Sequence, residues 1–205
     1  HKRALEGDKG KNTGGMGAYS PSRLESEKLE KKIIEKIIEP TLKGLKNINN
    51  KFKGFLYAGL MILDGEPFLI EYNVRMGDPE TQVVLSRLKN DFVDILTCCE
   101  NQTLDKVDFH FDMKSYTNVV LASGGYPEKY EKGKLITGLD NISESTIFHA
   151  GTIKKDNNIY TNGGRVLSVV SSAAKMKDAL KKSYNTINKI EFLGKTFRKD
   201  IGFDL

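Results

Sequence analysis

The chain has 205 residues, of which 39% are hydrophobic and 29% are charged, and its net charge is +5. A chain of this size can bury a core without disulfide staples, and its longest apolar run, Phe55 to Leu63, is far too short to span a bilayer. The first residues, His1-Lys2-Arg3, lack the apolar stretch of a signal peptide. We therefore expect a cytoplasmic globular protein with no membrane partner. The excess Lys residues form no stripe with aromatic residues, so no nucleic-acid partner is expected either.

The first fifty residues predict a long loop followed by a helix. Residues 1–21 are polar and Gly-rich and have neither helical nor strand periodicity, and loops of this length are usually functional or disordered. Ser22-x-x-Glu25 has the form of a capping box, and apolar residues then recur at three and four positions. We expect a helix that begins there, is kinked or restarted at Pro40, and ends in the polar stretch 47–50.

A β-hairpin is predicted next, followed by helices. Phe55–Leu63 is apolar and β-prone, Asp64-Gly65 is a strong turn signal, and Pro67–Arg75 is the return strand. Alternation on the return strand separates an apolar face, which we expect to be buried, from a face with polar residues. The apolar face consists of Phe68, Ile70, Tyr72 and Val74, and the other face of Leu69, Glu71, Asn73 and Arg75. Asp78 suits a helix N-cap and Pro79 the first helical position.

The pattern lapses at residues 100–108, which we interpret as a domain boundary between residues 1–100 and 108–205. The second part alternates short β-prone runs with Gly turns and closes with a helical pattern. The expected strands are 116–123, 146–154, 158–161 and 166–172, and the expected helix is 174–187. The fold class is therefore α+β.

The most informative chemical feature is the face that carries Glu71, Asn73 and Arg75. A carboxylate and an amide oxygen are ligands suited to Mg²⁺ shared with substrate phosphates, and the planar fork of an Arg suits a phosphoryl or carboxylate oxygen. The alternative is an edge strand with one solvated face. The helix start at Gly77-Asp78-Pro79-Glu80 offers unpaired amides and a positive dipole beside that face.

The Gly-rich segment 12–20 could hold an anion with its backbone amides, although a flexible loop is the simpler interpretation. It lacks the Gly-Lys-[Ser/Thr] of a P-loop and the third Gly of a dinucleotide fingerprint.

Several of these segments resemble the glycinamide ribonucleotide synthetase (phosphoribosylamine–glycine ligase) family of the ATP-grasp superfamily. The motif from Glu71 to Gln82 resembles the family signature, and His1-Lys2-Arg3 and Asn12 to Pro21 resemble the segment before it. Four later motifs, 121–127, 149–152, 161–166 and 198–202, resemble the family's C-terminal domain. Order and spacing agree along nearly the whole chain.

The resemblance implies a fold, a reaction and a set of site residues. The fold would be the C-terminal part of an ATP-grasp domain, an antiparallel sheet with helices, followed by a small α+β domain. The reaction would join glycine to 5-phosphoribosylamine, with ATP phosphorylating the glycine carboxylate, in purine biosynthesis. Metal ligands for Mg²⁺ or Mn²⁺ would be Glu71 and Asn73, and Arg75, Asp78 and Glu80 would act at the reacting groups. Residues implied to bind the nucleotide or close over substrate are Lys2, Arg3, Asn12, Thr13, Gly14, Gly15 and Gly17.

Two departures and one difference in length accompany the resemblance. Met76 stands where the family more often has Phe, and Gly59 stands where many ATP-grasp enzymes place a second acidic ligand. Family members are roughly twice as long, so the chain resembles their C-terminal half, and the partner it would need is the N-terminal half of the same enzyme. We therefore expect the isolated chain to be inactive.

Three alternatives stay open from the sequence. Another ATP-grasp carboxylate–amine ligase would share the metal strand but should lack the motifs at 121–127 and 161–166. A non-catalytic binding or assembly module would keep the fold without turnover. A basic RNA-binding module would show salt-sensitive binding to RNA of any sequence.

Overall fold

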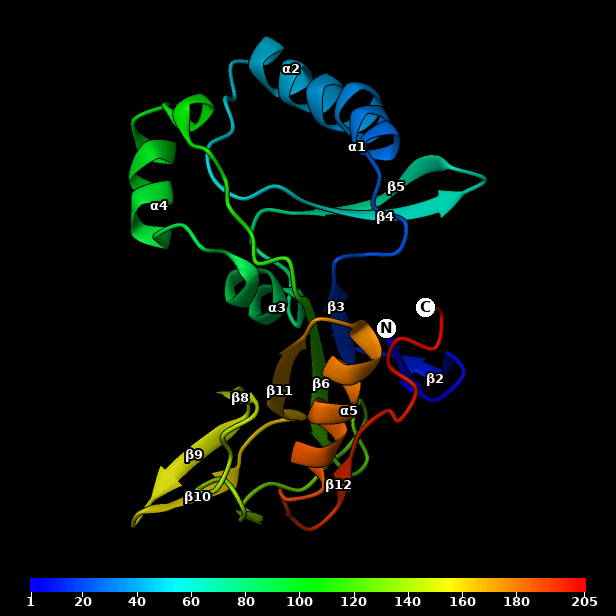
Figure 1. Ribbon diagram of the computed structural model, residues 1–205, viewed down its shortest axis with the longest axis vertical. Coiled ribbons are helices and arrows are strands. Elements are labelled where there is room, and N and C mark those ends of the chain that lie inside the picture. The colour runs from blue at the N-terminus through cyan, green and yellow to red at the C-terminus, as the bar shows by residue number, and fades with distance from the viewer. The chain divides into compact units, whose positions relative to one another are not determined.

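The computed structural model describes residues 1–205 and is a mixed α+β structure, as predicted (Figure 1). Backbone contacts divide it into two compact units that interleave along the chain. Unit 1 comprises His1–Pro21, Asp78–Leu88 and Asp112–Leu205, and unit 2 comprises Ser22–Gly77 and Lys89–Phe111. The N-terminal segment thus folds with the C-terminal part of the chain. The division of the family's domains at residues 100–108 stays a prediction.

A five-stranded antiparallel sheet forms the centre of unit 1. The central strand β6 (Ser115–Ser123) pairs on one side with β11 (Arg165–Ala173), which in turn pairs with β8 (Thr146–His149). On its other side β6 pairs with β3 (Gly17–Ser20) and, further along, with β12 (Lys195–Thr196). Strand β6 is buried along almost its whole length, because strands border both of its edges and helices cover both faces.

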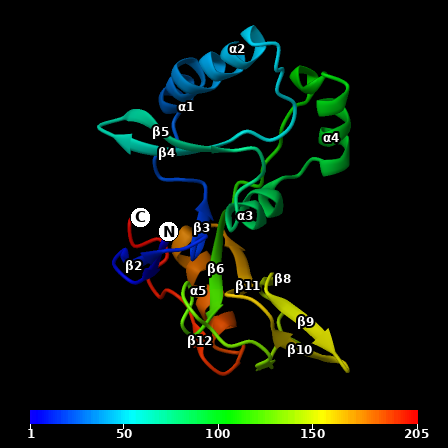
Figure 2. The same ribbon diagram turned by 180° about the vertical axis from the view of Figure 1, so that it is seen from behind.

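Helix α5 (Met176–Ile187) covers one face of this sheet, as the front and back views agree (Figures 1 and 2). Odd-numbered residues of β6 point to that side, since Thr117 Oγ1 lies 2.9 Å from Ser183 Oγ of α5 and Leu121 shares a buried cluster with Ile187. The strand alternation therefore builds the main hydrophobic core between β6, β11 and α5.

Helix α3 (Glu80–Arg87) covers the opposite face. Even-numbered residues of β6 point to it: Tyr116 packs with the buried Val83, and the Asn118 amide donates to the Pro79 carbonyl at 2.8 Å. The start of α3 is thus held by a side chain of the central strand.

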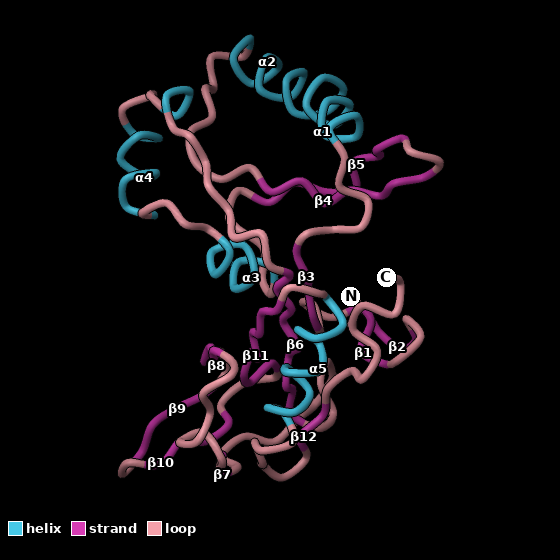
Figure 3. The backbone as a smooth tube through the Cα atoms, viewed as in Figure 1, coloured by secondary structure: helices cyan, strands magenta, loops and turns pink.

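The N-terminal segment of unit 1 differs from the prediction. Residues 1–21 contain three strands rather than a loop: β1 (Arg3–Leu5) pairs with β2 (Lys9–Asn12), and β3 joins the sheet. The cause is tertiary, because a short polar strand such as β3 is stabilised by pairing with β6 and has no periodicity of its own. Figure 3 shows β1 and β2 beside the C-terminal part of the chain.

The remaining strands of unit 1 form a small separate sheet in the order β7-β10-β9. Its members are β7 (Leu135–Ile136), β9 (Thr152–Lys155) and β10 (Asn158–Thr161). The expected strand 146–154 is two strands, β8 and β9, because the chain turns at Ala150-Gly151 between them. The other expected strands and the helix of this part are confirmed to within two residues.

Unit 2 opens with a nearly continuous helical stretch. It runs from α1 (Glu27–Ile33) through a five-residue π-helix, η1 (Ile34–Ile38), into α2 (Glu39–Asn47). The predicted capping box at Ser22 is wrong: the N-cap is Ser26, whose hydroxyl accepts a hydrogen bond from the Leu29 amide at 3.3 Å. Two further short helices, α4 (Phe92–Glu100) and η2 (Leu104–Lys106), complete the helical part of the unit. No helix of the chain is long and apolar enough to cross a bilayer.

The predicted hairpin is confirmed. Strand β4 (Tyr57–Leu63) pairs antiparallel with β5 (Glu66–Asn73), and Asp64 and Gly65 both have positive φ, as a two-residue type I′ turn requires. Lys32 and Lys36 of the helical stretch form ion pairs with Glu66, at 2.5 and 2.6 Å, and hold the turn.

The predicted burial of the apolar face of β5 is wrong in this chain. Phe68, Ile70 and Val74 are 53%, 63% and 75% exposed. The register also shifts between Gly59 and Leu60, which inserts Ile70 as an extra residue and interrupts the regular alternation. The physical reason is that the hairpin has only two strands, and the helical stretch that contacts β5 leaves these three side chains uncovered.

Candidate functional site

The carboxylate of Asp78 is held from both sides within unit 1. Arg165, at the start of β11, donates to Asp78 Oδ2 and to the Asp78 carbonyl, each at 2.9 Å, and Gln82 Nε2 donates to Oδ1 at 3.2 Å. Asp78 is therefore not the N-cap that its position predicts; Pro79 occupies that place without a side-chain cap. The carboxylate pairs with the guanidinium of Arg165, where both partners are charged, instead of with the first amides of α3.

Two buried amide oxygens lie on residues that hold the start of α3. Asn118 is completely buried and donates from its nitrogen to Pro79, but its Oδ1 has no hydrogen-bond partner in the protein, and neither has Oε1 of Gln82. Buried amide oxygens normally accept a hydrogen bond. We therefore expect a bound water or a substrate group to donate to them.

The Gly-rich segment packs directly against this carboxylate and its Arg. A Cβ on Gly14 would lie 2.9 Å from Arg165 Cζ, and a Cβ on Gly15, which has φ +124°, would lie 2.4 Å from Pro79 Cδ. Arg165 also donates to the Gly15 carbonyl at 3.3 Å. Gly15 is thus required by its backbone conformation and close approach to Pro79, whereas a side chain at Gly14 would displace the Arg165 guanidinium.

The amides of this segment already have acceptors inside the protein. The amide of Thr13 donates to the Lys2 carbonyl at 2.8 Å, that of Gly14 to the Tyr126 hydroxyl at 3.0 Å and that of Gly15 to the Thr13 hydroxyl at 2.9 Å. The Met16 amide donates to the carbonyl of the first residue at 2.8 Å. In this arrangement the four amides of residues 13–16 are not available to an anion, so binding through them would require the segment to rearrange.

The other residues implied to bind the nucleotide lie close by in unit 1. Arg3 and Asn12 are cross-strand partners in the β1–β2 hairpin, and Arg3 donates to the Gly10 carbonyl at 2.9 Å. Gly17 begins β3, where a Cβ would lie 2.8 Å from the Asn118 carbonyl oxygen. Glu80, the first residue of α3, is half-buried.

The predicted metal ligands lie in unit 2. Glu71 and Asn73 are alternate residues near the end of β5, so their side chains share one face of the hairpin. Directly across from Glu71 lies Gly59, and the Glu71 side chain lies over it, since a Cβ on Gly59 would be 3.1 Å from Glu71 Cγ. No group of three or more His, Cys, Asp or Glu side chains capable of holding a metal exists in the chain.

Arg75 lies beyond the strand on which it was predicted. Strand β5 ends at Asn73, and Arg75 follows in a bend, where its guanidinium donates to the Met76 carbonyl at 2.9 Å. Its placement on the face of Glu71 is therefore wrong, because the strand ends two residues earlier than the alternation predicts.

Tyr72, between the two predicted ligands, fixes β5 to the helical stretch. Its hydroxyl lies 2.8 Å from Thr41 Oγ1 and donates to the Ile37 carbonyl at 3.2 Å, inside the π-helix. π-helical turns widen the backbone and often occur at functional sites. The strand that carries Glu71 and Asn73 thus has a polar anchor on the side opposite to theirs.

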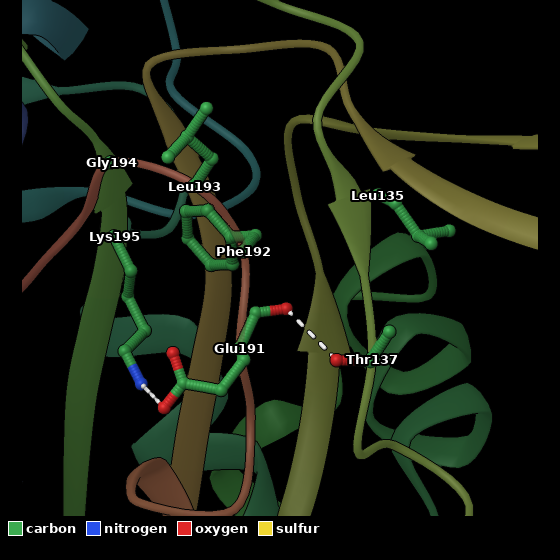
Figure 4. A pocket seen from close by; sticks show the side chains of 7 residues that line it. All are labelled: Leu135, Thr137, Glu191, Phe192, Leu193, Gly194 and Lys195. Atoms are coloured by element: carbon green, nitrogen blue, oxygen red, sulfur yellow. Dashed lines mark hydrogen bonds and ion pairs between the residues drawn. The ribbon is translucent and has the colours of Figure 1, made fainter.

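A separate recess of about 560 Å³ lies at the end of α5 (Figure 4). Two charged side chains, Lys195 and Glu191, line the recess. The Lys195 ammonium already contacts the Ile187 and Ile190 carbonyls and lies 3.0 Å from Glu191 Oε1. The Glu191 carbonyl in turn accepts from the Thr137 hydroxyl at 3.4 Å. Lys195 thus neutralises the carbonyl end of the helix, and the recess is structural rather than a second candidate site.

Reasoning from the sequence missed three residues of the site in unit 1: Arg165, Tyr126 and Asn118. Arg165 follows Gly163-Gly164 and Tyr126 follows Gly124-Gly125, so each comes directly after a Gly turn beside a strand. A polar side chain at such a turn is only a weak signal for a site. No local sequence pattern connects these two residues with the Gly-rich segment, which lies more than a hundred residues earlier. Asn118 gave a clearer signal, as an amide that directly precedes the apolar run 119–122.

Comparisons with known proteins place both parts of the chain in one family. The model of the phosphoribosylglycinamide synthetase ATP-grasp (A) domain matches residues 1–81, and that of the phosphoribosylglycinamide synthetase C domain matches residues 116–204.

Among curated proteins, two named phosphoribosylamine–glycine ligase are 44% identical over 206 residues (Fusobacterium nucleatum) and 46% identical over 205 residues (Chlorobaculum tepidum). Each alignment covers 98% of this chain and 48% of the relative. The crystal structure of phosphoribosylamine–glycine ligase from Thermotoga maritima has a TM-score of 0.86 at 40% identity, covering 97% of this chain and 49% of that one.

A more distant structure, urea carboxylase from Kluyveromyces lactis, has a TM-score of 0.63 at 12% identity and shares the fold alone. This chain spans about half the length of the relatives it matches. Both family models match in chain order, and the C-domain match includes the motifs that another ATP-grasp ligase should lack. The chain therefore belongs to the phosphoribosylglycinamide synthetase family.

Proposed function

We propose that this chain is part of an ATP-dependent ligase that joins glycine to 5-phosphoribosylamine, giving glycinamide ribonucleotide, ADP and phosphate. The observation that carries the proposal is identity of 40–46% along nearly the whole chain to proteins named for this reaction. Because the chain spans about half of those relatives, the activity is assigned to a longer protein that supplies the other half. We place that protein in the cytoplasm.

The donor set on β5 fits a hard divalent cation. Glu71 and Asn73 supply one carboxylate and one amide oxygen on the same face of a strand, and the Glu71 side chain lies over Gly59 of the neighbouring strand. Two protein oxygens are typical of an Mg²⁺ site that is completed by waters and substrate phosphates, and Mn²⁺ accepts the same ligands. When bound there, the cation would neutralise charge on the ATP phosphates.

The reaction consists of two transfers. A glycine carboxylate oxygen attacks the terminal phosphorus of ATP, the bond to the bridging oxygen breaks, and ADP leaves. The amine of phosphoribosylamine then attacks the carbonyl carbon of the resulting acyl phosphate, phosphate leaves, and the amine loses a proton. Phosphoryl transfer of this kind depends mainly on positioning and charge neutralisation. We assign Arg75, an exposed guanidinium beyond the strand, to the transferred phosphoryl group or the glycine carboxylate.

The residues of unit 1 would act on the acceptor side of the reaction. Asp78, two residues before α3, and Glu80, its first residue, would shape the sites of glycine and the amine. Since the amides of residues 13–16 are engaged, phosphate contacts in this region would fall to side chains, and Lys2, Arg3 and Asn12 carry the suitable groups.

A coupled assay on the longer protein tests the proposal, with the 205-residue chain alone as the comparison. We expect the longer protein to release ADP only when both ATP and glycine are present, and to form glycinamide ribonucleotide when freshly made phosphoribosylamine is added. The chain alone should not turn over, and its ATP affinity should be millimolar or weaker, roughly −4 kcal/mol. Absence of glycine-dependent ADP release by the longer protein would refute the proposal, as would robust turnover by the chain alone.

A further inference from the structure

Arg165 connects two segments of unit 1 that the sequence separates widely. Its guanidinium donates to the Asp78 carboxylate and carbonyl, both at 2.9 Å, and to the Gly15 carbonyl at 3.3 Å. The side chain is only 20% exposed, whereas that of Asp78 is 50% exposed. Three acceptors on two segments therefore fix the orientation of this largely buried, planar guanidinium.

The backbone that presents Arg165 is fixed by close packing. A Cβ on Gly151 would lie 2.5 Å from the Arg165 carbonyl oxygen and 2.6 Å from Gly163 Cα, so two backbone segments touch there. Ser123 in β6 holds the same turn, because its amide donates to the Gly164 carbonyl and its hydroxyl to the Gly163 carbonyl, each at 2.8 Å. Arg165 therefore projects from a rigid support rather than from a mobile loop.

Tyr126 provides a second attachment next to the first. Its hydroxyl accepts the Gly14 amide at 3.0 Å, and its ring lies against Gly164, where a Cβ would be 2.2 Å from Tyr126 Cδ2. Consecutive residues of the Gly-rich segment are thus held by two side chains of the C-terminal part, one through an amide and one through a carbonyl.

We infer that Arg165 is a positioning residue, which locks the Gly-rich segment 12–20 and the Asp78 carboxylate into a single arrangement. The inference deepens the proposed function and rests on it for its consequence in catalysis. A glycyl phosphate can react with the amine or with water, and the segment decides between them if it covers the site. Loss of Arg165 would free the segment and let water attack, which returns glycine and phosphate without forming the product.

The first test is hydrogen exchange in the full-length enzyme, because it does not depend on activity. In Arg165→Ala we expect the amides of Gly14 and Gly15 to exchange about 10-fold faster or more. This increase corresponds to a free energy of local opening that is lower by about 1.4 kcal/mol or more. The matched control is Lys11→Ala, which removes an ion pair with Glu128 that also links the N-terminal segment to the region of Tyr126 but is exposed on both sides. An exposed pair contributes little, so this control should exchange like the wild type.

The second test measures the ratio of phosphate released to glycinamide ribonucleotide formed. We expect the ratio to rise in Arg165→Ala but not in Lys11→Ala, and kcat/KM to fall by about 100-fold as the site loosens. Adding free guanidinium to Arg165→Ala should lower this ratio part of the way back to the wild-type value. Arg165→Lys keeps the charge but lacks the planar fork, so its ratio should stay above that of the wild type. A purely structural role would lower the folded fraction without changing the ratio.

The outcomes separate the inference from the proposed function. Unchanged exchange at Gly14 and Gly15 in a folded Arg165→Ala protein would overturn the inference, whatever the enzyme catalyses. If the alanine variant does not fold, Arg165→Gln with added guanidinium provides the same comparison. Faster exchange together with a wild-type enzyme that shows no glycine-dependent ADP release would support the positioning role and refute the proposed ligase.

Discussion

Replacing Arg198 by Met should destabilise unit 1 substantially, because this guanidinium joins the two ends of the chain. Its side chain is completely buried. It donates to both oxygens of Asp200, at 2.7 and 2.8 Å, and to Asp8 Oδ1 at 2.7 Å. Asp200 also accepts the Gly7 amide at 2.7 Å, so the β1–β2 hairpin is held to the C-terminal segment through this one cluster.

The magnitude follows from what the substitution leaves behind. Breaking a buried ion pair costs about 3–5 kcal/mol, because the remaining charge stays buried without its partner. Asp8 is 51% exposed and would be solvated by water, whereas Asp200 is 20% exposed and would keep most of the penalty. We therefore expect the lower end of the range, about 3 kcal/mol, or a fall in Tm of roughly 6–12 °C.

Calorimetric unfolding of Arg198→Met and of Arg23→Met measures this effect. Arg23 is exposed, so the control makes the same chemical change without removing a buried pair and should unfold within about 0.5 kcal/mol of the wild type. A loss of less than about 1 kcal/mol in Arg198→Met would show that the cluster is solvated and that the ends of the chain are held by other contacts.

The pH dependence provides an independent check of the same cluster. The hydrogen bonds from Arg198 lower the pKa of Asp200 in the folded state. A lowered carboxyl pKa contributes stability that is present above the unfolded pKa of about 3.9 and is lost as the pH falls through the lower folded value. The stability gap between the wild type and Arg198→Met should therefore be widest near pH 7 and narrow as the pH falls, because protonation relieves the unpaired Asp200 in the variant and removes the paired charge in the wild type. A gap that widens in acid would contradict the assignment.

Three further predictions concern single residues. Gly15→Ala should lower the stability of unit 1 by more than about 1 kcal/mol in thermal unfolding, because φ is +124° and the new Cβ would come within 2.4 Å of Pro79; a neutral result would place this loop differently. Hydrogen bonds from Lys32 and a second lysine lower the pKa of Glu66 to about 2, so an NMR titration of its carboxyl should show that midpoint, and Lys32→Ala should shift it upward. Tyr72→Phe should destabilise unit 2 by about 1 kcal/mol in urea unfolding, since it removes a hydroxyl with two partners in the helical stretch; no change would mean that the hydroxyl is solvated instead.

The parts of the fold that the sequence predicts are those determined by local chemistry. The turn at Asp64-Gly65 needs positive φ at both positions, and Asp and Gly tolerate positive φ better than most residues. The two turn residues and the patterns of the flanking strands were therefore enough to predict the hairpin. The buried runs around Val119 and Val169 likewise predict β6 and β11, because both strands are apolar over most of their length.

The errors arise where tertiary contacts decide the outcome. Strand β3 has no pattern of its own and exists because it pairs with β6. Asp78 has the sequence context of an N-cap, but an Arg 87 residues later binds its carboxylate. The alternation of β5 is broken by an extra residue at Ile70, and a bulge leaves no mark in the spacing of polar and apolar residues.

The candidate site divides in the same way. Glu71 and Asn73 could be proposed as ligands from the sequence, because carboxylate and amide oxygens at alternate strand positions have a chemistry of their own. Arg165 and Tyr126 could not, because their role depends on which segment they meet in space. The Gly-rich segment could be identified as important, but the close approaches at Gly14 and Gly15 that explain its composition are visible only in the structure.

The most direct test of the proposed ligase is the rate of glycine-dependent ADP formation by full-length Glu71→Gln enzyme over a range of Mg²⁺ concentrations. If Glu71 binds the cation at the ATP phosphates, removing its charge should slow turnover by about 10²- to 10³-fold, as for a lost electrostatic contact of about 2.7–4 kcal/mol, and should raise the Mg²⁺ concentration needed for half-maximal rate. The fold should stay intact, because Glu71 is exposed on the hairpin. Near-normal turnover with an unchanged Mg²⁺ requirement would contradict the metal site and the account built on it.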